Sequence, residues 1–147
     1  MDYNNILPVV LAGGKSKRFG EDKSQVQLGD KILIDHVLTE IKDDFKEILI
    51  VVNSPIKHLS SNKITEISDY QKNLGPLGGV LSAMKWIKSN NKKYKWIATF
   101  PSDTPFFRKN ILNNFYDKIN EKESELFFMK SNEKRHNIFG LWSLDLI

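Results

Sequence analysis

Apolar residues along this chain form short continuous runs and spaced stripes, and the two kinds alternate. Continuous runs rich in β-branched residues are typical of strands buried on both faces, whereas stripes at three- and four-residue spacing are typical of helices. The runs predict strands over residues 6–11, 47–52, 63–67, 96–100, 126–129 and 138–142. The stripes predict helices over residues 34–45, 80–87 and 110–119.

This alternation predicts an α/β fold with a doubly wound, mostly parallel sheet and helices on both faces. In such a sheet, ligands bind at the carboxyl ends of the strands. That rule places residues 11–23, 53 and 101–106 at one edge of the sheet. The glycine-rich segment 75–79, interpreted as a loop, would fold over the same edge.

Length and composition are those of one globular domain spanning residues 1–147. Of its residues, 40% are hydrophobic and 27% are charged. No apolar run approaches the roughly 18 residues of a membrane span, and the first residues lack a signal-peptide pattern. The absence of cysteine excludes disulfides, zinc–thiolate sites and thiol nucleophiles. We therefore expect a cytoplasmic protein without membrane contact.

The chain has a net charge of +4. It has no stripe of basic residues with aromatic residues between them, and this argues against nucleic-acid binding.

The stretch VVLAGGKSKRFG, residues 9–20, contains two incomplete phosphate-binding patterns. A P-loop would require glycine at position 9, which is Val9, and the spacing of Gly13, Gly14 and Gly20 fits no dinucleotide fingerprint. Adjacent glycines nevertheless let backbone N–H groups approach an anion closely. Four cations follow within nine residues: Lys15, Lys17, Arg18 and Lys23. The alternative interpretation is a solvated basic loop.

Two carboxylates are candidates for metal or nucleotide contacts. Asp103 comes shortly after a predicted strand, where it could hold Mg²⁺, an ion that prefers one or two carboxylates together with phosphate oxygens. A helix N-cap or an Asx-turn is the alternative for this residue. Asp69 precedes the 75–79 segment and is a second candidate contact or a turn residue.

Four motifs in order resemble those of the molybdenum cofactor guanylyltransferases, a MobA-type nucleotidyltransferase family. They are LAGG with RFGEDK at residues 11–14 and 18–23, GPLGG at 75–79, PSDTPF at 101–106 and HNIFGLW at 136–142. Asn137 stands where the family commonly has proline. The resemblance covers nearly the whole chain.

The resemblance implies a nucleotide-diphospho-sugar-transferase-like variant of the Rossmann fold. It implies transfer of GMP from Mg-GTP to the terminal phosphate of molybdopterin, or of molybdenum-molybdopterin, with release of pyrophosphate. By position, the nucleotide contacts would be Leu11, Ala12, Gly13, Gly14, Lys23, Asn53, Asp69, Gly78 and Asp103. The catalytic residues would be Arg18, Lys23 and Asp103, with Asp103 as the Mg²⁺ ligand. Because cytidylyltransferase relatives have LAAG in the first motif, Gly13 favours guanine.

Several alternatives stay open. His136 either faces the acceptor phosphate or makes a structural hydrogen bond, and we expect Phe139, Leu141 and Trp142 to pack in the core rather than stack on a pterin. Family members continue past the position of Ile147 by a few dozen residues, so we expect a short C-terminal part with an incomplete acceptor side. A nucleotidyltransferase specific for CTP or a sugar phosphate, and a non-catalytic GTP-binding remnant, are the competing functions. Contacts with molybdoenzymes or cofactor-insertion proteins are also compatible with the resemblance.

Overall fold

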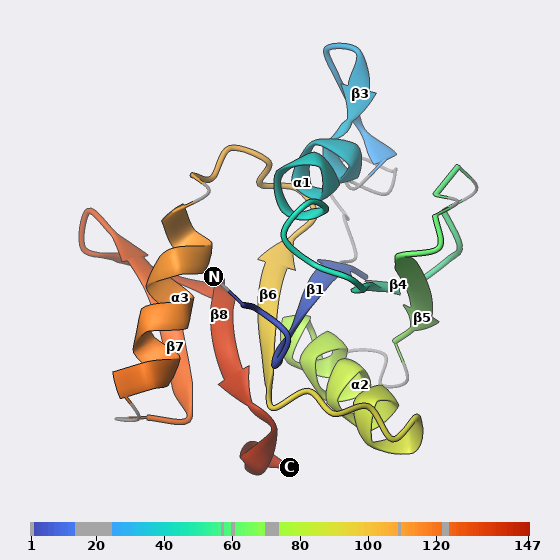
Figure 1. Ribbon diagram of the computed structural model, residues 1–147. Helices are drawn as coiled ribbons and strands as arrows, with labels where there is room; N and C mark the ends of the chain where they lie inside the picture. Colours follow the sequence, from blue (N-terminus) through green and yellow to red (C-terminus); the bar gives the residue numbers. More distant parts are fainter. Residues whose placement is uncertain are drawn as a thin grey trace.

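The computed structural model describes residues 2–13, 25–56, 58–59, 61–69, 74–108, 110–121 and 124–147. Within these ranges the chain forms a six-stranded sheet, a two-stranded hairpin and three α-helices (Figure 1). The strands of the large sheet are β1 (Ile6–Ala12), β4 (Ile48–Val52), β5 (Ile64–Ser68), β6 (Trp96–Pro101), β7 (Leu126–Ser131) and β8 (Lys134–Ser143). The helices are α1 (Leu33–Ile41), α2 (Pro76–Ser89) and α3 (Asn110–Glu121). The hairpin pairs β2 (Gln27–Leu28) with β3 (Lys31–Ile32), and a 3₁₀ turn, η2, covers Leu144–Leu146.

The large sheet has the strand order β5-β4-β1-β6-β8-β7. Strands β5, β4, β1 and β6 are parallel to one another, and β8 runs antiparallel to both β6 and β7. The predicted doubly wound, mostly parallel α/β fold is therefore confirmed. Strands β1 and β4, in the middle of the parallel part, are apolar without interruption because helices cover both faces of the sheet.

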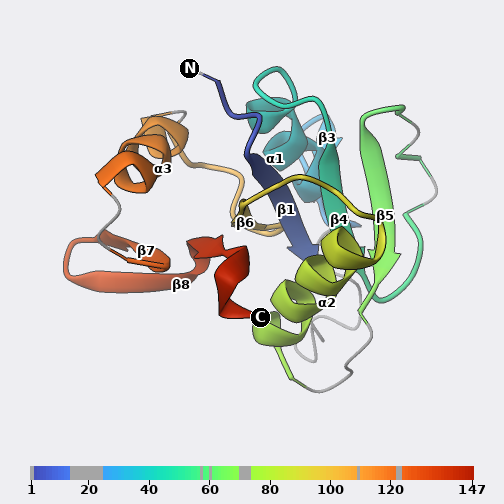
Figure 2. The same ribbon diagram turned by 60° about the horizontal axis from the view of Figure 1, so that its bottom comes forward.

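Each face of the sheet has its own hydrophobic core. On one face, α1 and α3 pack over alternate strand residues such as Val10, Ile50 and Phe100. On the other face, α2 packs over the intervening residues, among them Val9 and Val51. Figure 2 shows this layering, with α1 and α3 on the opposite side of the sheet from α2. Alternation of this kind follows from the two-residue period of a strand.

The helix bounds differ most from the predicted ones at the end of α1 and at the start of α2. Helix α1 ends at Ile41, and Phe45 reaches the same core from the turn that follows. Helix α2 begins at Pro76, so Gly78 and Gly79 lie in its first turn rather than in a loop. Proline suits the first helical position because it lacks an N–H that would otherwise be unpaired. Close packing explains the glycine at 79, since a Cβ there would lie 2.9 Å from Leu11 Cδ2.

The buried Thr99 hydroxyl joins β6 to the antiparallel strand β8. Its Oγ1 donates to the carbonyl of Ile138 at 2.6 Å and accepts from the N–H of Gly140 at 3.2 Å. It also accepts from the indole Nε1 of Trp142 at 3.0 Å. Phe139, Leu141 and Trp142 are buried, so the prediction that they pack in the core is confirmed. Strands β7 and β8 are joined by a tight hairpin turn at Asn132 and Glu133.

None of the helices in the described ranges is long and apolar enough to cross a membrane. The hairpin of β2 and β3 was not predicted, because two-residue strands carry no periodic pattern.

We predict that Gly140→Ala lowers the free energy of unfolding by about 1–3 kcal/mol, the usual cost of overpacking a core. An added Cβ would lie 2.9 Å from Trp142 Nε1 and 3.2 Å from the backbone oxygen of Phe127. Urea denaturation measures the change. Lys134→Ala, an exposed position in the same strand, is the control. A Gly140→Ala protein as stable as the parent would contradict the tight packing.

Candidate active site

The predicted site lies at the carboxyl ends of the four parallel strands. These ends are Ala12 in β1, Val52 in β4, Ser68 in β5 and Pro101 in β6. Asn53 and Asp69 follow their strands directly, Gly13 follows β1, and Asp103 comes two residues after β6. Register supports the grouping, since Leu11 of β1 pairs with Pro101 of β6 and Val52 of β4 with Ser68 of β5.

Asn53, Gly13 and Asp69 are in direct proximity. The side-chain amide of Asn53 donates a hydrogen bond to the Gly13 carbonyl oxygen. A Cβ on Gly13 would lie 3.3 Å from Asn53 Oδ1 and 3.9 Å from Asp69 Oδ2. Glycine thus keeps the backbone at position 13 close to both polar side chains. The contact brings the ends of β1, β4 and β5 to one point.

Asp69 is held by both its backbone and its side chain. Its N–H donates to the Val52 carbonyl at 3.2 Å, which continues the β4–β5 ladder beyond the strand. Its Oδ1 lies 3.1 Å from the hydroxyl of Ser82 in α2. The same hydroxyl lies 2.9 Å from the carbonyl oxygen of Gly78. Asp69 therefore connects the sheet edge to helix α2.

Asp103 is an exposed carboxylate on the β6 side of the edge. The Ser102 N–H donates to the Leu11 carbonyl at 3.3 Å, so the β1–β6 ladder extends to the residue before Asp103. The Thr104 hydroxyl donates to Asp103 Oδ1 at 3.3 Å. The N-cap alternative for Asp103 is wrong, because the next helix starts only at Asn110. Its carboxylate is open to a ligand from solvent.

Comparison with known proteins agrees with this geometry. Residues 8–147 match the model of the MobA-like NTP transferase domain. A molybdenum cofactor guanylyltransferase of Haemophilus influenzae (strain 86-028NP) is 32% identical over 146 residues, which cover 96% of this chain and 72% of that protein. One from Nitrobacter hamburgensis is 26% identical over 140 residues, covering 94% of this chain and 67% of that protein.

This chain belongs to the MobA-like NTP transferase family. It is a nucleotidyltransferase, and the resemblance identified from its motifs is confirmed. Two solved structures share its fold. Molybdopterin-guanine dinucleotide biosynthesis protein A from Archaeoglobus fulgidus has a TM-score of 0.73 and 22% identity, covering 95% of this chain and 68% of that one. The 2-C-methyl-D-erythritol 4-phosphate cytidylyltransferase of Francisella tularensis has a TM-score of 0.66 and 15% identity, covering 95% and 73%.

Other predicted contact residues of this nucleotidyltransferase lie around the same edge. Ala12 is buried and Leu11 is half-buried, so either would meet a nucleotide through its backbone. Gly78 is buried in the first turn of α2. Gly14, Arg18 and Lys23, with the remaining cations of the basic loop, lie outside the described residues.

His136 lies on β8 near the hairpin turn. Its Nε2 and the Ser131 hydroxyl of β7 are 2.7 Å apart and share a hydrogen bond across the hairpin. This contact is of the structural kind foreseen for His136. Its role toward an acceptor phosphate stays a prediction.

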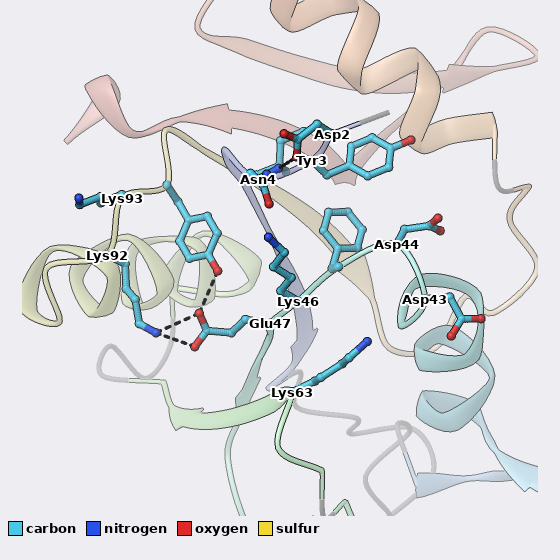
Figure 3. A pocket seen from close by; sticks show the side chains of 13 residues that line it. Asp2, Tyr3, Asn4, Asp43, Asp44, Lys46, Glu47, Lys63, Lys92 and Lys93 are labelled. Carbon is cyan, nitrogen blue, oxygen red and sulfur yellow. Dashed lines mark hydrogen bonds and ion pairs between the residues drawn. The ribbon is translucent and has the colours of Figure 1, made fainter.

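A pocket of about 570 Å³ lies at the opposite end of the parallel strands (Figure 3). Its lining includes residues that directly precede strands, such as Glu47 before β4 and Lys63 before β5. Glu47 pairs with Lys92 at 2.9 Å and accepts a hydrogen bond from the Tyr94 hydroxyl at 2.9 Å. Burial, followed by the hydrogen bond to Glu47, raises the pKa of Tyr94 well above its ordinary value. Because ligands of such sheets bind at the carboxyl ends, we do not assign the nucleotide to this pocket.

Ser82 is a polar residue that contacts this edge through Asp69 and that the sequence did not single out. Its only signal was a serine within the apolar stripe of α2, and its contact with Asp69 spans thirteen positions of sequence. Patterns of spacing do not report such a contact.

We predict that Tyr94→Phe lowers the free energy of unfolding by about 0.5–1.5 kcal/mol, the usual net value of one hydrogen bond. Because the folded pKa lies above 10.0, the ordinary value, this contribution is complete below pH 10 and is lost as pH rises toward the folded pKa. Thermal unfolding across pH measures it. Nucleotide binding should be unchanged in Tyr94→Phe. The control is Lys93→Ala, which changes an exposed residue of the same pocket and should also leave nucleotide binding unchanged. Loss of nucleotide binding in Tyr94→Phe would contradict the assignment of the site to the opposite edge.

Proposed function

We propose that this nucleotidyltransferase transfers GMP from Mg-GTP to the terminal phosphate of molybdopterin, or of molybdenum-molybdopterin, and releases pyrophosphate. The observation that carries the proposal is the cluster of Gly13, Asn53 and Asp69 at the carboxyl edge, beside the exposed Asp103. The names of the relatives support the two substrates. The proposal includes a cytoplasmic location and contacts with molybdoenzymes or cofactor-insertion proteins.

The nucleotide would lie across the ends of β1, β4 and β5. The backbone of residues 11–14 would approach it most closely, because glycine at position 13 leaves room there. Asn53 and Asp69 offer an amide and a carboxylate that suit the polar edge of a base or the ribose hydroxyls. The first turn of α2 at Gly78 borders the same region.

The donor set of Asp103 fits a magnesium ion. A single exposed carboxylate supplies a hard oxygen ligand, and Mg²⁺ takes its other ligands from phosphates and water. Within the part of the chain that the structure describes, no group of three or more His, Cys, Asp or Glu could hold a metal. The ion would therefore depend on the nucleotide for much of its coordination. Bound there, Mg²⁺ would supply charge neutralisation between the two phosphate-bearing substrates.

The chemistry is an in-line displacement at the α-phosphorus. An oxygen of the acceptor phosphate forms the new bond to this phosphorus, and the bond to the bridging oxygen of the β-phosphate breaks, which releases pyrophosphate. The reaction needs no covalent protein nucleophile, so the protein contributes positioning and charge stabilisation. Arg18 and Lys23 would stabilise the charge that develops on the transferred phosphoryl group and on pyrophosphate.

A pyrophosphate-release assay with molybdopterin and Mg²⁺ tests the proposal, with GTP, CTP, ATP and UTP compared in parallel. We expect release with GTP and molybdopterin together. Faster release with CTP, or with a sugar phosphate as acceptor, would assign the chain to a related specificity. GTP binding without release would make it a binding protein, and either result overturns the proposed reaction.

We predict that Lys23→Ala and Asp103→Ala each reduce GMP transfer about a hundredfold or more, because each removes electrostatic stabilisation of the transition state. Both proteins should unfold at the parent temperature. Asp117→Ala, which removes an exposed carboxylate of α3, is the matched control and should turn over normally. GMP transfer at the parent rate in Lys23→Ala or Asp103→Ala would contradict this mechanism.

We predict that Gly13→Ala folds normally and changes the preference between nucleotides. The added methyl would lie 3.3 Å from Asn53 Oδ1, a contact that a shift of a few tenths of an ångström relieves. Since cytidylyltransferase relatives carry alanine here, the ratio of GTP to CTP affinity should fall about tenfold, the effect of one added methyl in a tight site. Isothermal titration with both nucleotides measures the ratio. If the ratio of GTP to CTP affinity did not change, Gly13 would have no role in selecting the base.

A further inference from the structure

Ser82 is a polar residue on the buried face of helix α2. Only 1% of its surface is exposed, and it lies among the apolar residues Val80, Ala83 and Met84. A serine within a helix commonly returns its hydroxyl to the carbonyl four residues earlier. That contact exists here, at 2.9 Å to Gly78. A second contact, at 3.1 Å to Asp69 Oδ1, leads out of the helix toward the site.

The hydroxyl of Ser82 has one proton and can donate it to one acceptor at a time. The Asp69 carboxylate is the stronger of the two acceptors. The Gly78 carbonyl already receives a backbone N–H in the regular ladder of an α-helix. An ionised carboxylate has acceptors only, and hydrogen bonds to a charged group are roughly twice as strong as neutral ones. We therefore assign the Ser82 proton to Asp69.

The two carboxylate oxygens of Asp69 face different structures. Oδ1 faces Ser82, and Oδ2 lies on the side of Gly13, 3.9 Å from the position that a Cβ on Gly13 would take. The Asp69 N–H is bonded to Val52, so its backbone is also held. Fixing Oδ1 therefore fixes the direction in which Oδ2 points, toward Gly13, beside which the nucleotide would bind.

We propose that Ser82 is a positioning residue for nucleotide binding. Its hydroxyl anchors Asp69 Oδ1 so that Oδ2 stays directed at Gly13, while Ser82 itself, being buried, does not touch the nucleotide. The inference rests on the proposed function, in which Asp69 contacts the nucleotide. It adds helix α2 to the elements that set nucleotide affinity, through one hydrogen bond.

The test measures the equilibrium dissociation constant for Mg-GTP by isothermal titration. Ser82→Ala should bind about tenfold more weakly, the effect expected from losing one hydrogen bond to a charged group. Ser82→Thr keeps the hydroxyl and should stay within about threefold of the parent. Ser89→Ala removes an exposed serine of the same helix and is the matched control. Thermal unfolding of every variant shows whether the fold is retained.

A double-mutant cycle with Asp69→Ala separates the two contacts of Ser82. If Ser82 acts through Asp69, Ser82→Ala causes little further loss of affinity in the Asp69→Ala protein. A purely structural serine, bonded to Gly78 alone, would weaken binding equally in both backgrounds, and that result overturns the inference. Parent-like affinity of Ser82→Ala overturns it too, while the proposed function stands. If the parent protein binds none of GTP, CTP, ATP or UTP, the proposed function falls and the inference falls with it.

Discussion

The candidate site depends on the fixed position of one strand, β1. This strand pairs with β4 along one edge and with β6 along the other, and Leu7, Val9 and Val10 are fully buried. Any slide of β1 along its axis would break two ladders of hydrogen bonds and disturb the cores on both faces. Its carboxyl end therefore provides a fixed reference point for the residues around it.

The site residues inherit their spacing from this arrangement. Asn53 and Asp69 come directly after β4 and β5, so the distance between them follows from the 4.7–4.9 Å separation of neighbouring strands. The ladder bond from Ser102 to Leu11 extends the same regularity toward Asp103. Among the residues that the structure describes, a few polar side chains at the strand ends form this edge. The absence of a side chain at Gly13 leaves space beside Asn53, whose amide donates to the Gly13 carbonyl.

Much of this fold could be predicted because the parallel strands are buried on both faces. Continuous apolar runs such as residues 48–52 favour buried strands, and the rule for carboxyl ends then placed Asn53, Asp69 and Asp103 on one edge. The predicted start of α2 was wrong, because the composition of residues 75–79 is typical of a loop. In the structure, burial of Gly78 and Gly79 against the sheet outweighs the weak helix propensity of glycine.

The part that could not be predicted consists of contacts between distant residues. Ser82 has the spacing of a core position in α2, and only its position beside Asp69 gives it a role in the site. Thr99 is similar, because its hydroxyl is satisfied by backbone and indole groups of β8, about forty positions away. The spacing of residues in the sequence predicts which face of a helix or strand a side chain lies on. The residue that it contacts depends on how the helices and strands pack together.

The turn between β7 and β8 limits which insertions this hairpin can accept. Asn132 and Glu133 both have positive φ, at 47° and 65°, a geometry that favours two-residue hairpin turns. A register shift of β8 by one residue would exchange its two faces and withdraw the Trp142 indole from Thr99. A bulge is the device that absorbs such a slip, and the register already shifts once, between Phe128 and Met129. Insertions in this hairpin are therefore compatible with the fold when the turn or a bulge absorbs them, so that the pairing of β8 with β6 keeps its register.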